Sequence, residues 1–201
     1  MQCAIGVACR LRFTTKSRLL AWPESTRVHD LTKGIPHEDG SVDVVYSSHM
    51  LEHLGPDQAD FLLSEVWRVL KAGGTLRLIV PDLASAVQAY LHGDHAFFHA
   101  HDIPIGDAFM TTFYKRHVVR RGRLERLARR VLRTEDGGHK WMYDAESLRD
   151  RLAYAGFVDI KQVTRGEGRE PSAAQLDHRS AHGLHFEAVK PQSLCVAAHP
   201  R

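Results

Sequence analysis

The chain has little cysteine and no long apolar run. Its three cysteines, Cys3, Cys9 and Cys195, are too few and too scattered for a disulfide scaffold, so we expect free thiols in a reducing, cytoplasmic environment. No apolar run reaches the roughly 20 residues that cross a bilayer. The first ten residues lack a basic segment ahead of an apolar stretch, so no secretory signal is predicted.

A strong charge of one sign is also missing. The 201 residues carry 27 Lys and Arg against 24 Asp and Glu, a net charge of +3, which does not by itself predict a nucleic-acid partner. Hydrophobic residues make up 43% and charged residues 25% of the chain, a composition typical of globular proteins. The length corresponds to one ordinary domain.

A strand, a helix and a second strand are predicted between residues 42 and 80. The β-branched run 42–47 follows the turn residues Asp39 and Gly40, and apolar residues recur at helical spacing over 58–71. A glycine pair at 73–74 is expected to end the helix, and 75–80 is a second β-rich run. Such a unit is a right-handed crossover between parallel strands, which predicts an α/β fold with helices on both faces of a mostly parallel sheet.

The second half of the chain continues this pattern. Residues 82–135 are predicted to be helical with a loop near 101–106, and Asp144 is expected to cap a further helix that ends at Gly156. Strands are predicted at 157–163 and 184–189, with a polar loop between them. This late pair of strands predicts an antiparallel edge strand.

Several segments, in this order and spacing, resemble class I S-adenosylmethionine-dependent methyltransferases, in particular the small bacterial branch called type 11. The matching segments are 28–36 (VHDLTKGIP), 39–54 (DGSVDVVYSSHMLEHL), 65–74 (EVWRVLKAGG) and 76–82 (LRLIVPD), followed by His139, 147–148 and 155–157. The resemblance implies a Rossmann-like, doubly wound sheet of seven strands. It places S-adenosylmethionine across the carboxyl ends of these strands, where open α/β sheets bind ligands.

The resemblance also implies roles for particular residues. Asp30 matches the acidic residue that lies beside the adenine amino group, and Leu31 matches the position that adds a backbone N–H and an apolar contact. Ser47 and Ser48, at the end of a strand, are expected to line the cofactor. His49 is expected to face the transferred methyl group as the catalytic residue, where a histidine suits proton removal near neutral pH. The alternative is that His49 only holds a loop.

Glycine is scarce where the family has most of it. The family carries a G-x-G-x-G turn after its first strand, because the backbone must approach the cofactor closely. Here Gly6 is the only glycine before Gly34. We therefore expect an amino-terminal unit that is abbreviated, replaced or truncated. The same absence supports an alternative function, that of a catalytically degenerate methyltransferase-fold protein that is inert or acts as an interaction partner.

Three parts of the chain are distinguished on this basis. They are a divergent amino-terminal segment (1–27), a methyltransferase domain (28–191) with a basic helical insertion (92–138), and a tail (192–201). In the insertion, the segment from Arg116 to Arg133 is predicted to form an amphipathic cationic helix. It is either a solvated face over a packed stripe, or a surface for an anionic acceptor, a membrane surface or RNA.

The acceptor side is predicted from two further positions. Asp82 ends a strand at the ligand edge and either faces substrate or caps the next helix, and His139 either faces substrate or is a loop histidine. We expect a small-molecule or glycan-linked acceptor, with anionic compounds among the options. The histidines of the insertion lack the further ligands that a zinc site needs, so no metal site is predicted. They are His92, His95, His99 and His101.

Overall fold

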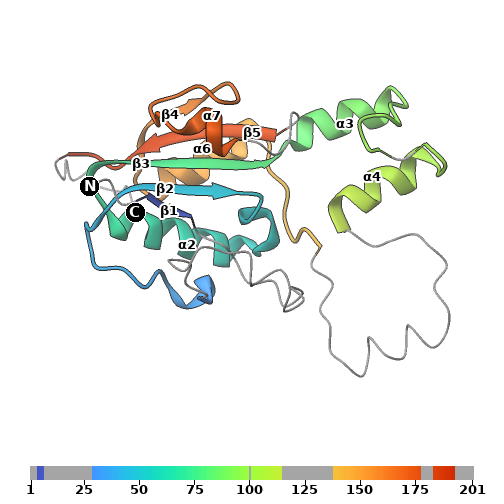
Figure 1. Ribbon diagram of the computed structural model, residues 1–201. Helices are drawn as coiled ribbons and strands as arrows, with labels where there is room; N and C mark the ends of the chain where they lie inside the picture. Colours follow the sequence, from blue (N-terminus) through green and yellow to red (C-terminus); the bar gives the residue numbers. More distant parts are fainter. Residues whose placement is uncertain (1–3, 7–28, 100, 115–137, 178–182, 193–201) are drawn as a thin grey trace, which may run out of the picture.

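The computed structural model describes residues 4–6, 29–99, 101–114, 138–177 and 183–192 (Figure 1). The described strands form one five-stranded sheet in the order β1-β2-β3-β5-β4. Strands β1, β2 and β3 run parallel to one another, and β5 runs antiparallel to both of its neighbours, β3 and β4. Their bounds are β1 Ala4–Gly6, β2 Val42–Ser48, β3 Leu70–Pro81, β4 Val158–Gln162 and β5 Gly183–Val189.

The α/β class, the mostly parallel sheet and the antiparallel pairing at its edge are confirmed, because the edge strand β4 pairs antiparallel with β5. The antiparallel strand β5 lies inside the sheet, and β4 is the edge strand. Burial explains this order. Six of the seven residues of β5 are buried, whereas four of the five residues of β4 are exposed. A strand that is buried on both faces needs two neighbours, while a polar strand suits an edge.

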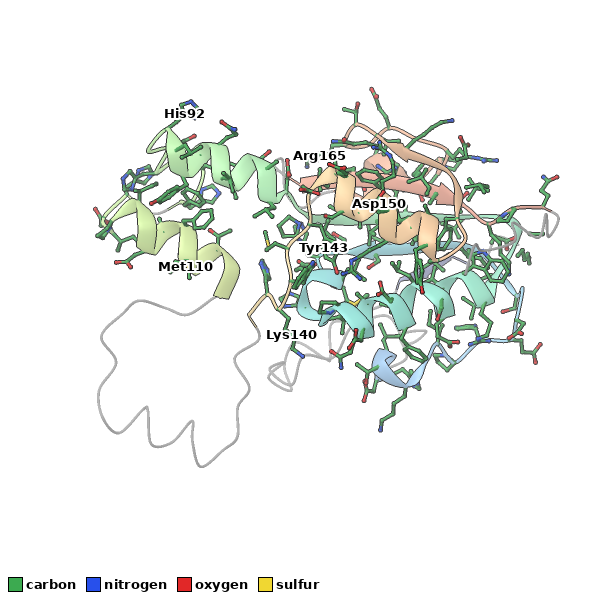
Figure 2. The ribbon with its side chains drawn as sticks, turned by 180° about the vertical axis from the view of Figure 1, so that it is seen from behind. His92, Met110, Lys140, Tyr143, Asp150 and Arg165 are labelled. Atoms are coloured by element: carbon green, nitrogen blue, oxygen red, sulfur yellow. The ribbon has the colours of Figure 1, made fainter. Side chains whose placement is uncertain are left out.

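Helices α2 (Pro56–Val69) and α6 (Ala145–Tyr154) cover one face of the sheet. Figure 2 shows them together on the side turned toward the viewer. The indole Nε1 of Trp67 donates to the carbonyl of Gly156 at 3.2 Å, which joins α2 to the end of α6. The main core lies between these helices and the sheet. It includes Leu62, Leu63 and Val66 of α2, Leu148 and Leu152 of α6, and Leu76, Leu78, Leu184 and Phe186 of the strands.

The opposite face carries the short helix α7 (Ala173–Leu176) and the loop before it. The hydroxyl of Tyr46 in β2 donates to the carbonyl of Leu176 at 2.8 Å. Helical structure therefore lies on both faces, as the doubly wound prediction requires.

Below this loop lies a buried ionic group that we call the Arg77 cluster, made of Arg77, Asp177 and Glu187. The guanidinium of Arg77 donates to both oxygens of Asp177, with an Nε–Oδ1 distance of 3.1 Å, and to Oε1 of Glu187 at 2.7 Å. All three side chains are at most 5% exposed. The backbone N–H of Gly166 also donates to Oδ2 of Asp177 at 2.8 Å, and the N–H of Arg169 donates to Oε2 of Glu187 at 2.6 Å. Every charge in the cluster therefore has hydrogen-bond partners.

The glycine pair does not end helix α2, contrary to the prediction. The helix ends at Val69, and Leu70 adopts an extended conformation that begins β3 at once. Gly73, with φ of +77°, and Gly74 lie inside β3, beside a shift in register against β2. A Cβ at Gly74 would lie 2.9 Å from the carbonyl oxygen of Lys71 and 3.0 Å from that of Asp43. The pair permits this close strand approach.

Two helices extend past the carboxyl ends of β2 and β3 (Figure 1). They are α3 (Leu83–Leu91) and α4 (Ile105–Tyr114), of which α4 lies in the predicted insertion. The predicted cationic helix from Arg116 to Arg133 lies outside the described residues. Within the described part of the chain, no helix has the length and apolar character needed to cross a membrane.

Candidate functional site

The carboxyl end of β2 is held in an uncommon backbone conformation. His49 follows β2 directly and has φ of +52°, in the left-handed region that a residue with a Cβ rarely adopts. Its backbone N–H still donates to the carbonyl of Ile79 in β3 at 2.9 Å, which extends the pairing by one residue. Such local strain is typical of functional positions. The chain then enters the 3₁₀ turn η2 (Leu51–His53).

The loop before α6 closes against this turn. The backbone N–H groups of Lys140 and Trp141 donate to the carbonyl of Glu52 at 2.7 and 3.1 Å. The carbonyl of Tyr143 accepts from the N–H of Leu83, just past the end of β3. These bonds bring His139, which is 86 residues away from His53 along the chain, to the same edge of the sheet as β2 and β3.

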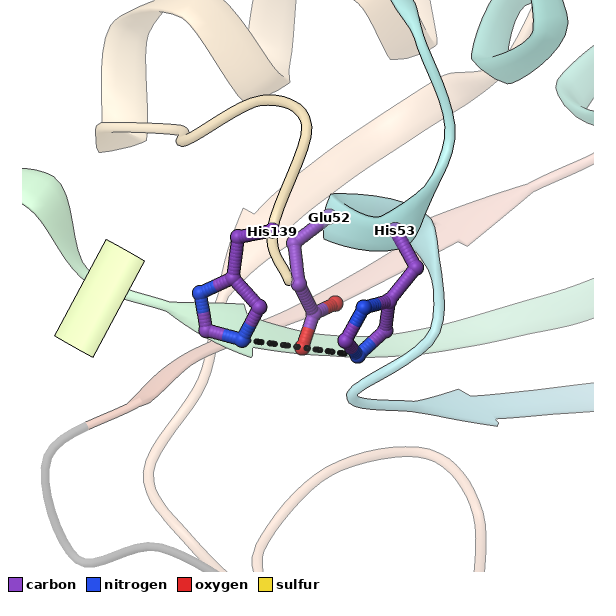
Figure 3. A group of neighbouring side chains, drawn as sticks. All are labelled: Glu52, His53 and His139. Carbon is purple, nitrogen blue, oxygen red and sulfur yellow. Dashed lines mark ion pairs between the residues drawn. The ribbon is translucent and has the colours of Figure 1, made fainter. Parts of the chain in front are cut away.

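At this edge three side chains converge, and we call them the Glu52 cluster: Glu52, His53 and His139 (Figure 3). The Nε2 atoms of His53 and His139 each lie 3.9 Å from Oε1 of Glu52. His49 contributes a third imidazole, with Nδ1 at 3.3 Å from the same oxygen. The side chain of Glu52 is fully buried, and those of His53 and His139 are 6% and 7% exposed.

The carboxylate of Glu52 has no hydrogen bond. Among the described residues, neither Oε1 nor Oε2 finds a donor in hydrogen-bonding geometry. The Nδ1 of His53 lies 3.2 Å from the carbonyl oxygen of Gly138. A carbonyl oxygen can only accept, so this ring nitrogen carries a hydrogen and donates it. Neighbouring Tyr143 is fully buried, and burial raises the pKa of its hydroxyl to about 12, which keeps it neutral.

The structure places Asp82 as a helix cap. Its carboxylate accepts from the N–H of Ala84 at 3.0 Å and from the hydroxyl of Ser85, at the start of α3. Asp82 also forms an isolated bridge with Tyr143, so it lies at the same edge as the Glu52 cluster. Its capping role is confirmed, and contact with a substrate stays a prediction.

Ser47 and Ser48 point to opposite faces of the sheet, because side chains alternate along a strand. Ser47 faces α2 and lines a small apolar cavity between β2, β3 and α2, together with Ile35, Met50 and Leu62 among others. Its hydroxyl is buried and has no partner among the described residues. Ser48 lies on the other face with Tyr46. A ligand on one face of the sheet can therefore contact only one of these two hydroxyls.

Asp30 and Leu31 lie at a separate 3₁₀ turn, which contacts helix α2. Asp30 caps the 3₁₀ turn η1 (Leu31–Lys33) by accepting from the N–H and the hydroxyl of Thr32 at 3.1 and 2.7 Å. The Thr32 hydroxyl, followed by its N–H, lowers the pKa of Asp30. The carboxylate remains 54% exposed, whereas Leu31 is buried in the core. No described contact joins Asp30 to His49 or to the Glu52 cluster.

Glu52 and His53 were not among the site residues predicted from the sequence. The available signal was local, because three potential ligands or bases, His49, Glu52 and His53, occur within five residues. The chain forms a 3₁₀ turn over Leu51–His53, and burial of Glu52 in this turn is not visible in the sequence. The insertion histidines do not gather with other ligands within the described residues; His92, for example, bonds the carbonyl of Gln88.

Part of this chain is similar to a known family and to one curated relative. Residues 8–78 match the family described as the methyltransferase domain. The match begins inside the segment that lacks the glycine-rich turn. The chain is also 37% identical over 57 residues to an uncharacterized methyltransferase of Synechocystis. That alignment covers 28% of this chain and 27% of the relative, so the chain matches only about a quarter of the relative's length.

The chain also resembles several solved structures, each at a TM-score below 0.5. A SAM-dependent methyltransferase from Archaeoglobus fulgidus is 16% identical, with a TM-score of 0.44. The similarity covers 88% of this chain and 73% of that one. A SAM-dependent methyltransferase from Methanosarcina mazei is 17% identical, with a TM-score of 0.42 and coverage of 83% and 67%.

Proposed function

We propose that this chain, which carries a class I S-adenosylmethionine-dependent methyltransferase domain, binds S-adenosylmethionine and transfers its methyl group to a small-molecule or glycan-linked acceptor. One structural observation supports this proposal most. The strained His49, the turn η2 and the loop 138–143 converge where the parallel strands β2 and β3 end. Ligands of open α/β sheets bind at this edge.

The residues present fit part of the cofactor. The exposed carboxylate of Asp30 retains free acceptor capacity beyond its bonds to Thr32, as an adenine amino group requires. The buried hydroxyl of Ser47, without a partner among the described residues, offers one more polar contact. The positions that would hold the ribose and methionine end correspond to residues outside the described ranges. We therefore assign only the adenine and methyl sides.

The protein's contribution to such a reaction is alignment. S-adenosylmethionine, when bound, supplies an electrophilic methyl group on a sulfonium, and the acceptor must approach it in line. Holding two reactants in this geometry contributes roughly 7–11 kcal/mol to catalysis. We assign Asp30 to the adenine amino group, Ser47 and Ser48 to the cofactor, and His49 to the acceptor side of the methyl group. Asp82 and His139 flank the acceptor.

Isothermal titration of the full chain with S-adenosylhomocysteine tests cofactor binding. We expect saturable 1:1 binding, because the product retains the adenine that Asp30 is proposed to hold. Asp30→Ala should weaken binding about tenfold, the equivalent of one hydrogen bond of about 1.4 kcal/mol. Asp57→Ala is the matched control, since Asp57 is an exposed aspartate in the first turn of α2 and should leave the affinity unchanged.

Two results would contradict the proposal at different levels. Equal affinity for the wild type and Asp30→Ala would remove the adenine assignment but keep the family function. Absence of binding at millimolar ligand would remove the enzymatic function. That outcome would favour the degenerate, non-catalytic alternative that the missing glycine-rich turn supports.

A further inference from the structure

The carboxylate of Glu52 poses an energetic question. It is fully buried, and no described group donates a hydrogen bond to either oxygen. A buried carboxylate is normally paired, hydrogen-bonded or bound to a metal, because leaving it without a partner costs several kcal/mol. The imidazoles of His49, at 3.3 Å, and of His53 and His139, each at 3.9 Å, lie around the Glu52 carboxylate but donate no hydrogen bond to its oxygens.

The orientation of the His53 ring limits what can neutralise the Glu52 carboxylate. Its Nδ1–H donates to the carbonyl of Gly138, so in the neutral ring Nε2 carries a lone pair. That lone pair and the carboxylate of Glu52 face each other across 3.9 Å. Two electron-rich groups held this way repel unless a proton or a metal cation lies between them. A backbone carbonyl on the far nitrogen of an imidazole is also the usual support for a metal-binding histidine.

The ligand atoms have the number and nature of a transition-metal site. One carboxylate oxygen and one nitrogen from each of His53 and His139 all lie within 4.8 Å of one another. Around tetrahedral zinc, with bonds of about 2.0–2.1 Å, ligand atoms lie roughly 3.4 Å apart, so the 3.9 Å pairs need to contract by roughly 0.5 Å. Imidazole ligands favour zinc, iron, nickel or copper over magnesium and calcium.

We propose that Glu52, His53 and His139 bind a divalent transition-metal ion, with zinc as the reference ion. Three protein ligands leave at least one coordination position open. His49, 22% exposed and beside the shared carboxylate oxygen, lies where a fourth ligand would come from. The ion would fasten the loop 138–143 to the turn η2 and form part of the edge where β2 and β3 end. This departs from the sequence prediction of no metal site.

Metal binding can be measured without the cofactor. The full chain, stripped with EDTA and dialysed, is titrated with ZnCl₂ by calorimetry, and Co²⁺ is used as a spectroscopic substitute. We expect one high-affinity equivalent per chain and a Co²⁺ absorption spectrum of a low-coordinate site with nitrogen and oxygen ligands. Failure of the wild type to bind zinc would overturn the proposal. Because cofactor titration in EDTA is a separate experiment, failure of the proposed function is distinguishable.

Variants locate the site. Glu52→Gln keeps the shape of the side chain but removes its charge, and His139→Ala removes a ligand that comes from a loop. Each should lower zinc affinity about 10- to 100-fold or more. The control is the double variant His92→Ala and His101→Ala, which removes histidines of the insertion and should bind zinc like the wild type. Unchanged affinity in Glu52→Gln and His139→Ala, or lost binding in the control, would show that zinc binds elsewhere and contradict the assignment.

Discussion

Among the described residues, charged side chains are buried in two clusters, and their hydrogen bonding differs. In the Arg77 cluster, on the α7 face of the sheet, the guanidinium meets two carboxylates, and backbone N–H groups complete their hydrogen bonds. In the Glu52 cluster, at the end of β2, the carboxylate has no hydrogen bond among the described residues. Both are almost fully removed from solvent.

This difference separates buried charges that stabilise the fold from buried charges that a bound ligand would neutralise. A network whose every donor and acceptor is paired holds the structure together, and removing one member leaves an uncompensated charge. A buried carboxylate without hydrogen-bond donors destabilises the folded protein. Its presence is therefore best explained by a ligand that binds to it. We therefore interpret the Arg77 cluster as structural and the Glu52 cluster as a binding site.

The largest effect is expected from Arg77→Met. It leaves Asp177 and Glu187 buried beside each other without their cation, and the free energy of unfolding should fall by about 3–5 kcal/mol in urea denaturation. Lys71→Met is the matched control, because its ion pair with Asp43, at 2.8 Å, is partly exposed and contributes less than about 1 kcal/mol. Similar losses in both variants would mean that the Arg77 cluster adds no special stability.

A smaller loss is expected from Gly168→Ala. Gly168 has φ of +144°, and a Cβ there would lie 2.7 Å from Nη1 of Arg77 and collide with the carboxylate of Glu187. We expect a loss of about 2–3 kcal/mol from strain and displacement of the cluster. Gly40→Ala separates the two causes, because Gly40 also has positive φ, +60°, but open space around it, and should lose only about 1 kcal/mol. Equal losses would show that the cluster tolerates displacement.

The free energy of unfolding should depend on pH through a histidine beside the Arg77 cluster. Burial lowers the pKa of the adjacent His185, which faces Asp177, Arg77 and Arg165. In the unfolded chain His185 titrates near pH 6.5. Between that value and its lower folded pKa, only the unfolded chain binds the proton, so stability falls as the pH drops below about 6.5.

The lowered pKa of Asp177 extends this loss at lower pH. Burial alone would raise the pKa of Asp177, but the hydrogen bonds from Arg77 and Gly166 outweigh burial. The stability from this carboxylate therefore begins to fall near its unfolded pKa of about 3.9 and is lost as the pH drops through its lower folded pKa. Urea denaturation at pH 7.5 and 5.5 checks the His185 contribution. His185→Gln should lose less stability than the wild type over that interval, whereas an identical pH response would contradict the assignment.

Much of the fold was predictable because its signals are local. The crossover from β2 through α2 to β3 follows from apolar periodicity, and the capping of α6 by Asp144 follows from a side chain that accepts from the N–H of Ser147 at 2.8 Å. The position of β5 was not predictable in this way, since strand order depends on burial contributed by distant segments. The prediction that Gly73 and Gly74 end a helix was wrong for the same reason, because these glycines lie at a bulge of β3 against β2.

The site was predictable only in part. His49 was named through the family resemblance, Asp82 because it ends a strand at the ligand edge, and His139 as a further position on the acceptor side. The role of Glu52 depends on burial and on a loop that arrives 86 residues later, as shown by the bonds of Lys140 and Trp141 to its carbonyl. No local pattern reports that a carboxylate will be left without donors.

The stability of Glu52→Gln in the presence of EDTA tests the distinction between the two clusters most directly. This variant should unfold at the same urea concentration as the wild type or at a higher one, because a neutral amide removes a buried charge and can donate to the lone pair of His53. Loss of more than about 1 kcal/mol without metal would show that the Glu52 carboxylate stabilises the fold and would contradict its assignment as a binding site.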